Sequence, residues 1–406
     1  MPSLDQCRFI AQAIDSVLAQ PEVDELIVAD GGSTDGTLPL LEELGRRHPR
    51  RLRWSSAPDS GPADAINRAV RQARGDIIGW LNSDDLYMPG AAARALAAFA
   101  AKPELSMVYG EGRHVDEAGA SIGRYPTLPP STPIDAFANG CFICQPTAFF
   151  RREAFVDLGG LDEALKTAFD FDLWLRMFRA FAPRIGFVDG EQAVSRLHAS
   201  GITLREREAV ALEGMRVLHR HLGSAPPEWL LTAFAEQAAR HPFADRPLPL
   251  RVHFARLIDT AASWTDEDGQ ARLRQRLQTD VAWKLATPHL FLEVHPDGWA
   301  SPLLEIRVRQ TAPPAVALRL RGRHARPGGG RLCVMAEVPG LAPQRFELAD
   351  NGSFTWIVRL PKAGSGSRVT LQLRTGDFFV PSTADAASAD ARELAYLVNS
   401  AELVSG

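Results

Sequence analysis

The sequence predicts an α/β fold with a mostly parallel, Rossmann-like sheet in its first half, followed by a helical connector and a β-sandwich. Helical and strand segments alternate up to about residue 200, and polar clusters follow the apolar strands directly. After about residue 300 the pattern changes to short segments of alternating apolar and polar residues. Alternating helices and strands are typical of a parallel sheet covered by helices. Ligands bind such sheets at the carboxyl ends of strands.

The elements of the first half follow from the spacing of apolar residues. Apolar side chains at helical spacing predict helices, and short apolar runs that end at turn residues predict buried strands. The predicted helices lie at 9–19, 38–44 and 63–73, and the predicted strands at 25–29, 52–54 and 76–81.

The second half has a different character. A stretch rich in Ala, Leu, Arg, Glu and Gln predicts helices up to about residue 290, and five alternating segments separated by Gly-rich turns predict a sandwich. We therefore expect three parts, over residues 1–205, 206–295 and 296–406. Aromatic residues of the sandwich could stack on sugar rings, although packing in its core is the better interpretation; they are Trp299, Trp356 and Phe378.

Composition excludes several classes of protein. A formal net charge of -4 over 406 residues gives no basic surface for nucleic acid. No apolar run reaches the roughly 20 residues of a membrane helix. The four cysteines, with a C-x-x-C at Cys141 and Cys144, predict core thiols rather than a disulfide framework or a zinc site. We expect a cytoplasmic protein that could contact the inner face of the membrane peripherally.

Two polar clusters follow predicted strands. The turn that begins at Asp30 contains glycines that allow a close backbone approach, so Asp30 could contact a ribose or a base; a plain strand-to-helix turn is the alternative. The paired carboxylates Asp84 and Asp85 suit a hard divalent cation that also binds substrate phosphates. An acidic loop is the alternative for this second cluster.

Two further clusters lie near the end of the α/β region. Asp170 and Asp172 open an amphipathic helix, where a carboxylate could act as a general base or could simply favour the helix N-terminus. Arg196 and His198 could hold phosphate and metal, respectively, although a lone histidine is more often structural.

Taken in order, these segments resemble the family 2 glycosyltransferases with the GT-A fold, over about residues 2–205. The turn after the first apolar strand, Asp-Gly-Gly-Ser-Thr-Asp-Gly-Thr, is similar to the nucleotide-contacting turn of the family, and Asn-Ser-Asp-Asp is similar to its metal element. The matching segments are 30–37, 59–67, 82–85, 145–152 and 159–174.

The resemblance implies an inverting, non-processive transfer from a nucleotide-diphosphate sugar donor to a glycan or lipid-linked saccharide acceptor, in bacterial cell-surface polysaccharide assembly. It implies Mg²⁺ or Mn²⁺ as cofactor, with Asp85 and His198 as metal ligands, and Asp170 as the catalytic base. The donor-binding residues that it implies are Asp30, Asp64, Asn67, Asp84 and Arg196.

Three features depart from the family pattern. The apolar strand that usually precedes the segment at 2–6 is expected to be missing here. Phe169 stands where the family often has Glu, which leaves Asp172 as an alternative base. The Q-x-x-R-W motif of processive members is not found. A catalytically inactive nucleotide- or glycan-binding protein is the alternative function.

Overall fold

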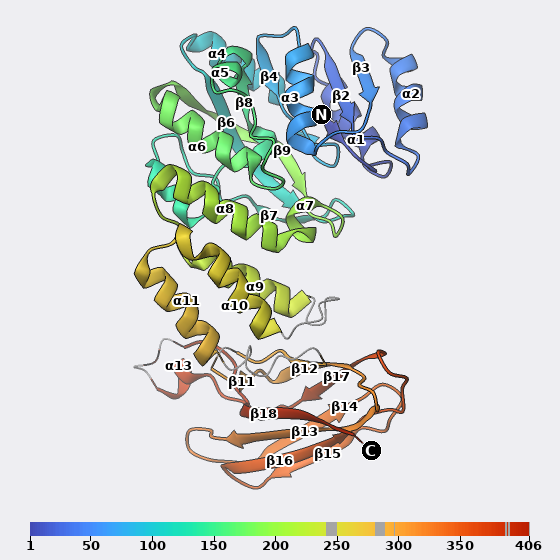
Figure 1. The fold of residues 1–406 in the computed structure, drawn as a ribbon, viewed down its shortest axis with the longest axis vertical. Helices are drawn as coiled ribbons and strands as arrows, with labels where there is room; N and C mark the ends of the chain where they lie inside the picture. The colour runs from blue at the N-terminus through green and yellow to red at the C-terminus, as the bar shows by residue number, and fades with distance from the viewer. Residues whose placement is uncertain (241–249, 281–288, 296, 386–387, 389, 406) are drawn as a thin grey trace. The chain divides into compact units, whose positions relative to one another are not determined.

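The computed structural model describes residues 1–240, 250–280, 289–295, 297–385, 388 and 390–405. The chain divides into two compact units, Met1–Pro226 and Pro227–Gly406 (Figure 1). The three-part division expected from composition, with a boundary near residue 205, stays a prediction. No helix in the described parts of the chain combines the length and apolarity needed to span a bilayer.

Unit 1 contains two sheets with helices around them. Its strands are β1 (Pro2–Ser3), β2 (Leu26–Asp30), β3 (Leu52–Ser56), β4 (Ile77–Gly79), β5 (Leu86–Tyr87), β6 (Met107–Val115), β7 (Ser121–Arg124), β8 (Phe149–Arg151) and β9 (Ile185–Arg196). Its α-helices are α1 (Ile10–Leu18), α2 (Thr37–Arg47), α3 (Pro62–Gln72), α4 (Ala91–Ala101), α5 (Arg152–Asp157), α6 (Phe169–Phe181), α7 (Ile202–Arg205) and α8 (Arg207–Leu222).

The first sheet has the order β1-β2-β3 and is parallel throughout. Pro2 pairs with Ala29, and the amino group of Met1 donates to the carbonyl of Ile27 at 2.9 Å. A two-residue strand, β1, therefore lies within the segment at 2–6 and pairs with β2, and the absence of a strand before that segment stays a prediction. This short strand keeps the carboxyl end of β2 next to a second strand end.

Helices cover both faces of the first sheet. Val28 of β2 packs in one core cluster with Ile14 of α1 and Leu41 of α2, whereas Ala29 packs with Ala65 of α3. Successive side chains of a strand point to opposite faces, so α3 covers the face opposite to α1 and α2. The predicted α/β arrangement is confirmed.

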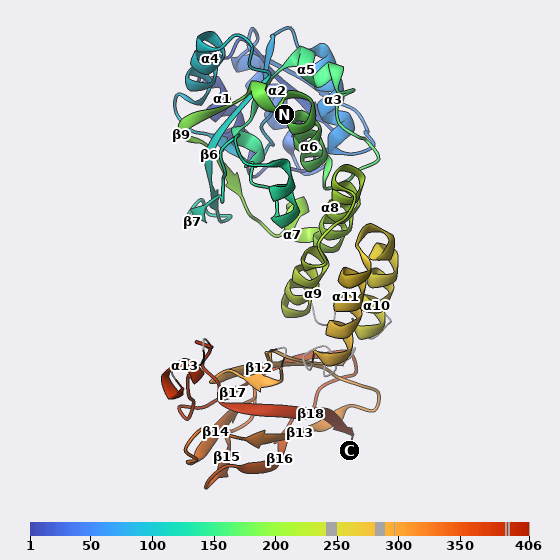
Figure 2. The ribbon, with the colours of Figure 1, turned by 90° about the vertical axis from the view of Figure 1, so that its left-hand side faces the viewer.

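The second sheet is mixed and has the order β4-β8-β6-β9-β5, with β7 paired to β6. Its central pair, β6 and β9, is parallel, and the two strands lie side by side in Figure 2. At the edge, β5 pairs antiparallel with β9, where Leu86 lies opposite Val194. This pairing brings the residues just before β5 to the residues at the end of β9.

Unit 2 begins with helices and continues as two antiparallel sheets. The helices α9 (Glu228–Arg240), α10 (Leu250–Ala261) and α11 (Glu267–Thr279) agree with the predicted helical stretch. The sheets have the orders β10-β12-β17-β14-β15 and β11-β18-β13-β16. Their strands are β10 (Leu290–Leu292), β11 (Trp299–Ala300), β12 (Leu303–Arg309), β13 (Ala315–His324), β14 (Leu332–Glu337), β15 (Gln344–Leu348), β16 (Gly352–Arg359), β17 (Arg368–Arg374) and β18 (Tyr396–Ser405), with the short helix α13 (Pro381–Ala384) before β18.

The aromatic residues of the sandwich mainly fill its core. Trp356 is 5% exposed and stacks on Phe354, and Phe378 packs against the same core cluster. Trp299 is half-buried and meets the ring of Phe379 edge to face. Core packing, the preferred interpretation of Trp356 and Phe378, therefore agrees with their positions.

Candidate active site

Asp30 ends β2, and its carboxylate is buried by the turn that follows. The backbone N–H groups of Ser33 and Gly32 donate to Oδ2 at 2.9 and 3.0 Å, and the hydroxyl of Ser56 donates to the same oxygen at 2.7 Å. Burial raises the pKa of Asp30, but these hydrogen bonds outweigh it and hold the pKa below its usual value. Asp30 thus fixes the shape of the turn, and its contact with a nucleoside stays a prediction.

Asp59 lies against this turn, although it was not among the predicted site residues. A Cβ on Gly31 would lie only 2.8 Å from Asp59 Oδ2, so the close approach requires glycine. Asp59 Oδ1 accepts the N–H of Gly61 at 3.0 Å, and the guanidinium of Arg68 lies 3.7 Å from Oδ2. The Asp-Ser-Gly-Pro stretch at 59–62 was the available signal.

Asp64, at the start of α3, is paired within the protein. Its carboxylate lies 3.2 Å from Nε of Arg68 and accepts the N–H of Ser60 at 3.1 Å. Arg68 thereby bridges Asp59 and Asp64 near the N-terminus of α3. A role of Asp64 in donor binding stays a prediction.

Asn67 connects α3 to the loop that precedes α6. Its Nδ2 donates to the carbonyl of Leu161 at 3.0 Å and to Oε1 of Glu163 at 2.8 Å, and its Oδ1 accepts the N–H of Leu161 at 2.9 Å. A Cβ on Gly160 would lie 2.7 Å from Asn67 Oδ1. Through these contacts Asn67 holds α3 against the loop at 158–163. They do not favour a role of Asn67 in donor binding, which stays a prediction.

The pairing of β5 with β9 brings the predicted metal residues together. The backbone N–H of Arg196 donates to Oδ1 of Asp85 at 2.9 Å, and its Nε donates to the carbonyl of Asp84 at 3.0 Å. Nε2 of His198 lies 2.9 Å from Oδ2 of Asp84. Four residues that sequence reasoning placed in one site thus meet at one edge of the second sheet.

His198 is held in one orientation. It is 3% exposed, its ring packs 4.8 Å from that of Phe9, and its Nδ1 lies 2.8 Å from the hydroxyl of Ser200. A hydroxyl can donate or accept, so Ser200 supports either tautomer of the imidazole. Nε2 can therefore present either a proton to Asp84 or a lone pair to a metal ion.

Asp85 is more deeply buried than its neighbour, at 3% exposure. Burial raises its pKa well above the usual value, and the charge of Asp84 raises the pKa further. Beyond the Arg196 N–H, its carboxylate accepts a hydrogen bond from the amide of Asn82 at 3.3 Å. A cation at this edge would stabilise the ionised form of both carboxylates.

The guanidinium of Arg196 is engaged inside the protein. Besides Asp84, it donates to the carbonyl of Glu117 and to Oε1 of Gln12, each at 3.2 Å, and it lies 4.9 Å from the ring centre of Phe9. Arg196 is 7% exposed. These contacts tie three segments together around His198, and the predicted contact of Arg196 with phosphate stays a prediction.

The side chains at this edge of the sheet fit a metal ion that takes only some of its ligands from the protein. Among the residues that the structure describes, no group of three or more His, Cys, Asp or Glu side chains is arranged for a metal. Asp84 and His198 form a pair whose oxygen and nitrogen already converge. Mg²⁺ is usually held by one or two carboxylates plus substrate phosphates. Carboxylate and water oxygens suit both Mg²⁺ and Mn²⁺, and imidazole is a softer ligand than carboxylate.

Asp170 lies in the first turn of α6 and is half-buried. Burial raises its pKa to about 6, although the N–H of Phe171 donates to Oδ1 at 2.7 Å. Its charge acts on the thiol of Cys141, where burial first and Asp170 second raise the pKa to about 12. Cys141 and Cys144 form no disulfide. Asp170 is therefore a carboxylate with few internal partners and with a pKa close to neutral pH.

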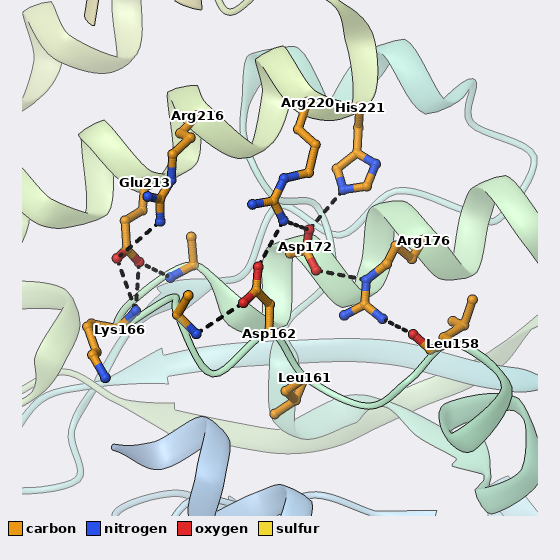
Figure 3. A network of polar contacts seen from close by, with 12 residues as sticks. Leu158, Leu161, Asp162, Lys166, Asp172, Arg176, Glu213, Arg216, Arg220 and His221 are labelled. Carbon is orange, nitrogen blue, oxygen red and sulfur yellow. Dashed lines mark hydrogen bonds and ion pairs between the residues drawn. The ribbon is translucent and has the colours of Figure 1, made fainter. Parts of the chain in front are cut away.

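Asp172, two residues further along α6, has the opposite environment. It is 1% exposed, and its carboxylate contacts Nε of Arg176 and Nε2 of His221, each at 2.8 Å, and the guanidinium of Arg220 at 3.3 Å (Figure 3). Burial raises its pKa, but these partners outweigh burial and lower it overall. Asp172 also lines a cavity of about 250 Å³ with Gly160, beside these partners. The ion pairs favour Asp170 over Asp172 as the base.

Aromatic packing connects the residue before Asp170 to the residues before Asp84 and Asp85. Trp80, just before Asn82, stacks on Phe169 with ring centres 5.7 Å apart, and its Nε1 donates to Oδ1 of Asn82 at 3.0 Å. The pKa of Cys144 is raised by burial first and also by the charges of Asp85 and Asp170. Phe169, the residue before Asp170, and Trp80, shortly before the carboxylate pair, thus belong to one packed region.

A sheet with helices on both faces and acidic side chains at its strand ends agrees with a glycosyltransferase domain of the GT-A type. Residues 1–159 match the family model described as "Glycosyl transferase family 2". The N-terminal part of the chain therefore belongs to glycosyltransferase family 2, and it is followed by an additional C-terminal domain.

Several curated proteins are similar to this part of the chain. Chondroitin synthase of Escherichia coli is 32% identical over 178 residues, which cover 44% of this chain and 26% of that protein. Hyaluronan synthase of Pasteurella multocida is 32% identical over 178 residues, which cover 18% of that protein. The putative glycosyltransferase EpsE of Bacillus subtilis is 32% identical over 177 residues, or 42% of this chain and 62% of that one. The chain thus spans less than two thirds of each of these relatives.

Solved structures also align with the chain. TarS of S. aureus in complex with UDP has a TM-score of 0.48 and 19% identity, with 68% of this chain and 83% of that chain covered. The mannosyltransferase PcManGT of Pyrobaculum calidifontis, in complex with GDP-Man and Mn²⁺, has a TM-score of 0.42 and 21% identity, with 68% and 77% covered.

Proposed function

We propose that this chain transfers a sugar from a nucleotide-diphosphate donor to a glycan or lipid-linked saccharide acceptor in polysaccharide assembly. The transfer is inverting and adds one sugar at a time. The observation that carries the proposal is the pair of chemically distinct carboxylate sites in unit 1. Asp84 faces His198 at 2.9 Å beside the buried Asp85, whereas Asp170 keeps few internal partners and a pKa of about 6.

The contacts favour an exchange of the roles expected for Asp84 and Asp85 in metal binding. The family resemblance implies that Asp85 and His198 bind the metal ion and that Asp84 contacts the sugar donor. Oδ1 of Asp85 already accepts the N–H of Arg196, whereas Oδ2 of Asp84 points at Nε2 of His198. We therefore propose that Asp84 and His198 hold Mn²⁺ or Mg²⁺ and that Asp85 supports them from the buried side. When bound, such an ion offsets the charge of a departing diphosphate.

Asp170 acts as the general base in this proposal. Its carboxylate accepts the proton of the acceptor hydroxyl while the hydroxyl oxygen bonds to the anomeric carbon. The bond from that carbon to the nucleotide diphosphate breaks in the same displacement, and its electron pair leaves with the diphosphate. A single displacement inverts the anomeric configuration.

The test is transfer and hydrolysis of a panel of UDP-, GDP- and dTDP-sugars, with Mn²⁺ or Mg²⁺ and with EDTA as the control. Asp170→Asn is expected to lower kcat at least 100-fold with little change in donor KM. Asp84→Asn and His198→Gln are expected to weaken the response to Mn²⁺ at least tenfold. Donor turnover that is indifferent to all three changes would contradict the site.

The same panel tests the alternative of an inactive binding protein. A rise in the unfolding temperature with UDP or GDP and Mn²⁺, combined with no turnover of any donor at any acceptor, would favour that alternative. Turnover of one donor would eliminate it.

A further inference from the structure

The N-terminus of α6 has no capping side chain of its own. Ala168 occupies the N-cap position, and no side-chain hydrogen bond caps the helix from there. The first N–H groups of a helix have no partners inside the helix and need an acceptor from elsewhere. Asp170 lies in this first turn, so whatever stabilises the turn also sets the position of the proposed base.

Glu213, from the middle of α8, supplies acceptors for the backbone just before this turn. Its Oε2 accepts the N–H of Thr167 at 2.8 Å and the N–H of Ala168 at 3.1 Å. Both of its oxygens lie 3.0 Å from the N–H of Lys166 (Figure 3). The hydroxyl of Thr167 donates to the same Oε2 at 2.9 Å. One carboxylate thus gathers three consecutive backbone N–H groups.

The charge of Glu213 suits this position. Burial raises its pKa, but the hydrogen bonds from residues 166–168 outweigh burial, so the pKa lies below the usual value. The carboxylate is therefore ionised at neutral pH. A negative charge next to a helix N-terminus is stabilised by the helix dipole, and Glu213 supplies the acceptor for the N–H of the N-cap residue Ala168 and of the two residues before it.

The C-terminal turn of α8 holds α6 at a second point. His221 and Arg220 contact the carboxylate of Asp172 at 2.8 and 3.3 Å, and Arg220 also contacts Asp162 at 2.9 Å. Asp170 therefore lies between two places, residues 166–168 and Asp172, that are fixed by the same helix. Two attachment points on either side of a residue restrict both the translation and the rotation of the helical turn that carries it.

We propose that Glu213 is a positioning residue for Asp170. It fixes residues 166–168, so that α6 begins at Phe169 and its first turn presents the Asp170 carboxylate to the region of Cys141. This inference rests on the proposed function, in which Asp170 is the base. Glu213 itself contacts backbone groups, one hydroxyl and, at 3.9 Å, the guanidinium of Arg216, and it takes no part in the bond changes.

The decisive variants are Glu213→Ala and Glu213→Gln in the full chain, with Glu206→Gln as the matched control. Glu206 pairs with the exposed Arg205 at 3.0 Å and precedes the same helix, so its change removes a carboxylate of α8 without touching residues 166–168. Glu213→Ala is expected to lower kcat about 10- to 100-fold with donor KM within about twofold, since orientation of a base acts on the transition state. Glu213→Gln keeps one acceptor oxygen and is expected to lose less.

A double-mutant comparison separates positioning from a general loss of structure. In an Asp170→Asn background, Glu213→Ala is expected to cause no further loss of transfer, because the group it positions is absent. An equal loss in both backgrounds, or a kcat equal to that of Glu206→Gln, would overturn the inference. If Glu213→Ala unfolds, the same comparison is made with Glu213→Gln.

Titration of the Asp170 carboxyl carbon by NMR, assigned through its loss in Asp170→Asn, gives a readout that needs no turnover. Release of residues 166–168 is expected to admit water to the first turn of α6 and to move the titration midpoint in Glu213→Ala toward the value of an exposed aspartate. An unchanged midpoint would overturn the positioning role. A wild-type chain without turnover, but with this shift in the variant, would instead overturn only the proposed function.

Discussion

Asp170 and Asp172 lie two residues apart on one helix and have opposite acidities because of their partners. Both are removed from water, which by itself raises the pKa of a carboxyl group. Asp172 has a guanidinium and an imidazole within 2.8 Å, so its pKa falls. Asp170 has backbone N–H groups instead of a cation as its partners among the described residues, so burial outweighs them and its pKa rises to about 6. A general base needs such a pKa near the working pH.

The raised pKa predicts the pH dependence of the transfer. The base must be ionised to accept a proton, so kcat/KM is expected to increase about tenfold per pH unit below pH 6 and to level off above about pH 7. Initial rates between pH 4.5 and 8 at saturating Mn²⁺ measure this. A profile that is flat across pH 6, or one that falls as pH rises, would contradict Asp170 as the base.

The same pKa predicts that the ionised Asp170 carboxylate lowers the free energy of unfolding of the chain. In the unfolded chain Asp170 ionises near the usual pKa of about 3.9, whereas in the folded chain it holds its proton up to about pH 6. The folded state therefore holds the Asp170 proton between these values, and the contribution of Asp170 to stability falls as pH rises from about 4 to 6 and then stays constant. Asp170→Asn is expected to gain roughly 1–3 kcal/mol at pH 7–8 and nothing at pH 4.

Urea denaturation of the two proteins at pH 4 and pH 8 measures this difference. If Asp170→Asn is less stable than wild type at pH 8, the ionised Asp170 carboxylate stabilises the fold. That result would contradict the prediction that the proposed base destabilises the folded chain.

At this scale the sequence predicts the kinds of residue in the site better than their contacts. Asp84, Asp85, Arg196 and His198 do meet, because the β5–β9 pairing joins segments that are more than 100 residues apart. That the guanidinium of Arg196 binds backbone carbonyls could not be inferred, since this depends on loops that approach only in the folded chain.

At the scale of elements, short segments hold the site together through few contacts. The loop at 158–163 is fastened to α3 by the amide of Asn67 and to α8 by the pair of Asp162 with Arg220. Sequence periodicity found α3, the strand that became β4 and the acidic start of α6. It could not find the role of α8, because helical spacing identifies a helix but not the surface on which it packs.

Asn67→Ala is expected to destabilise unit 1 by about 1–3 kcal/mol, because it leaves the buried N–H and carbonyl of Leu161 without partners. Thermal or urea unfolding measures the loss. Donor KM at a temperature where the variant is folded measures the second consequence, for which we expect less than a threefold change. A large rise in donor KM with unchanged stability would instead favour the donor-binding role expected from the family resemblance.

At the scale of the whole molecule, unit 1 and the sandwich each have a hydrophobic core of their own among the described residues. One is formed around Val28, Ile14 and Val108 in unit 1, and the other around Leu318, Leu320 and Ile306 in the sandwich. Alternation of buried residues with half-buried or exposed ones in β12 and β16 explains why the sandwich could be predicted. Its order of strands could not be predicted, because alternation fixes which face of a strand is buried and not which strand is its neighbour.

Two cores predict two unfolding events with different sensitivities. UDP or GDP with Mn²⁺ binds unit 1 in our proposal, so a saturating ligand is expected to raise only the transition that belongs to unit 1. Leu320→Ala, in the centre of the sandwich core at 0% exposure, is expected to lower only the other transition, by about 2–5 kcal/mol. Differential scanning calorimetry of wild type and variant, each with and without ligand, measures all four combinations. The two changes are expected to add independently, because sites without shared partners rarely couple. A single transition that responds to both changes would show that the two cores unfold as one cooperative unit, and the assignment of donor binding to unit 1 alone would then lose its support.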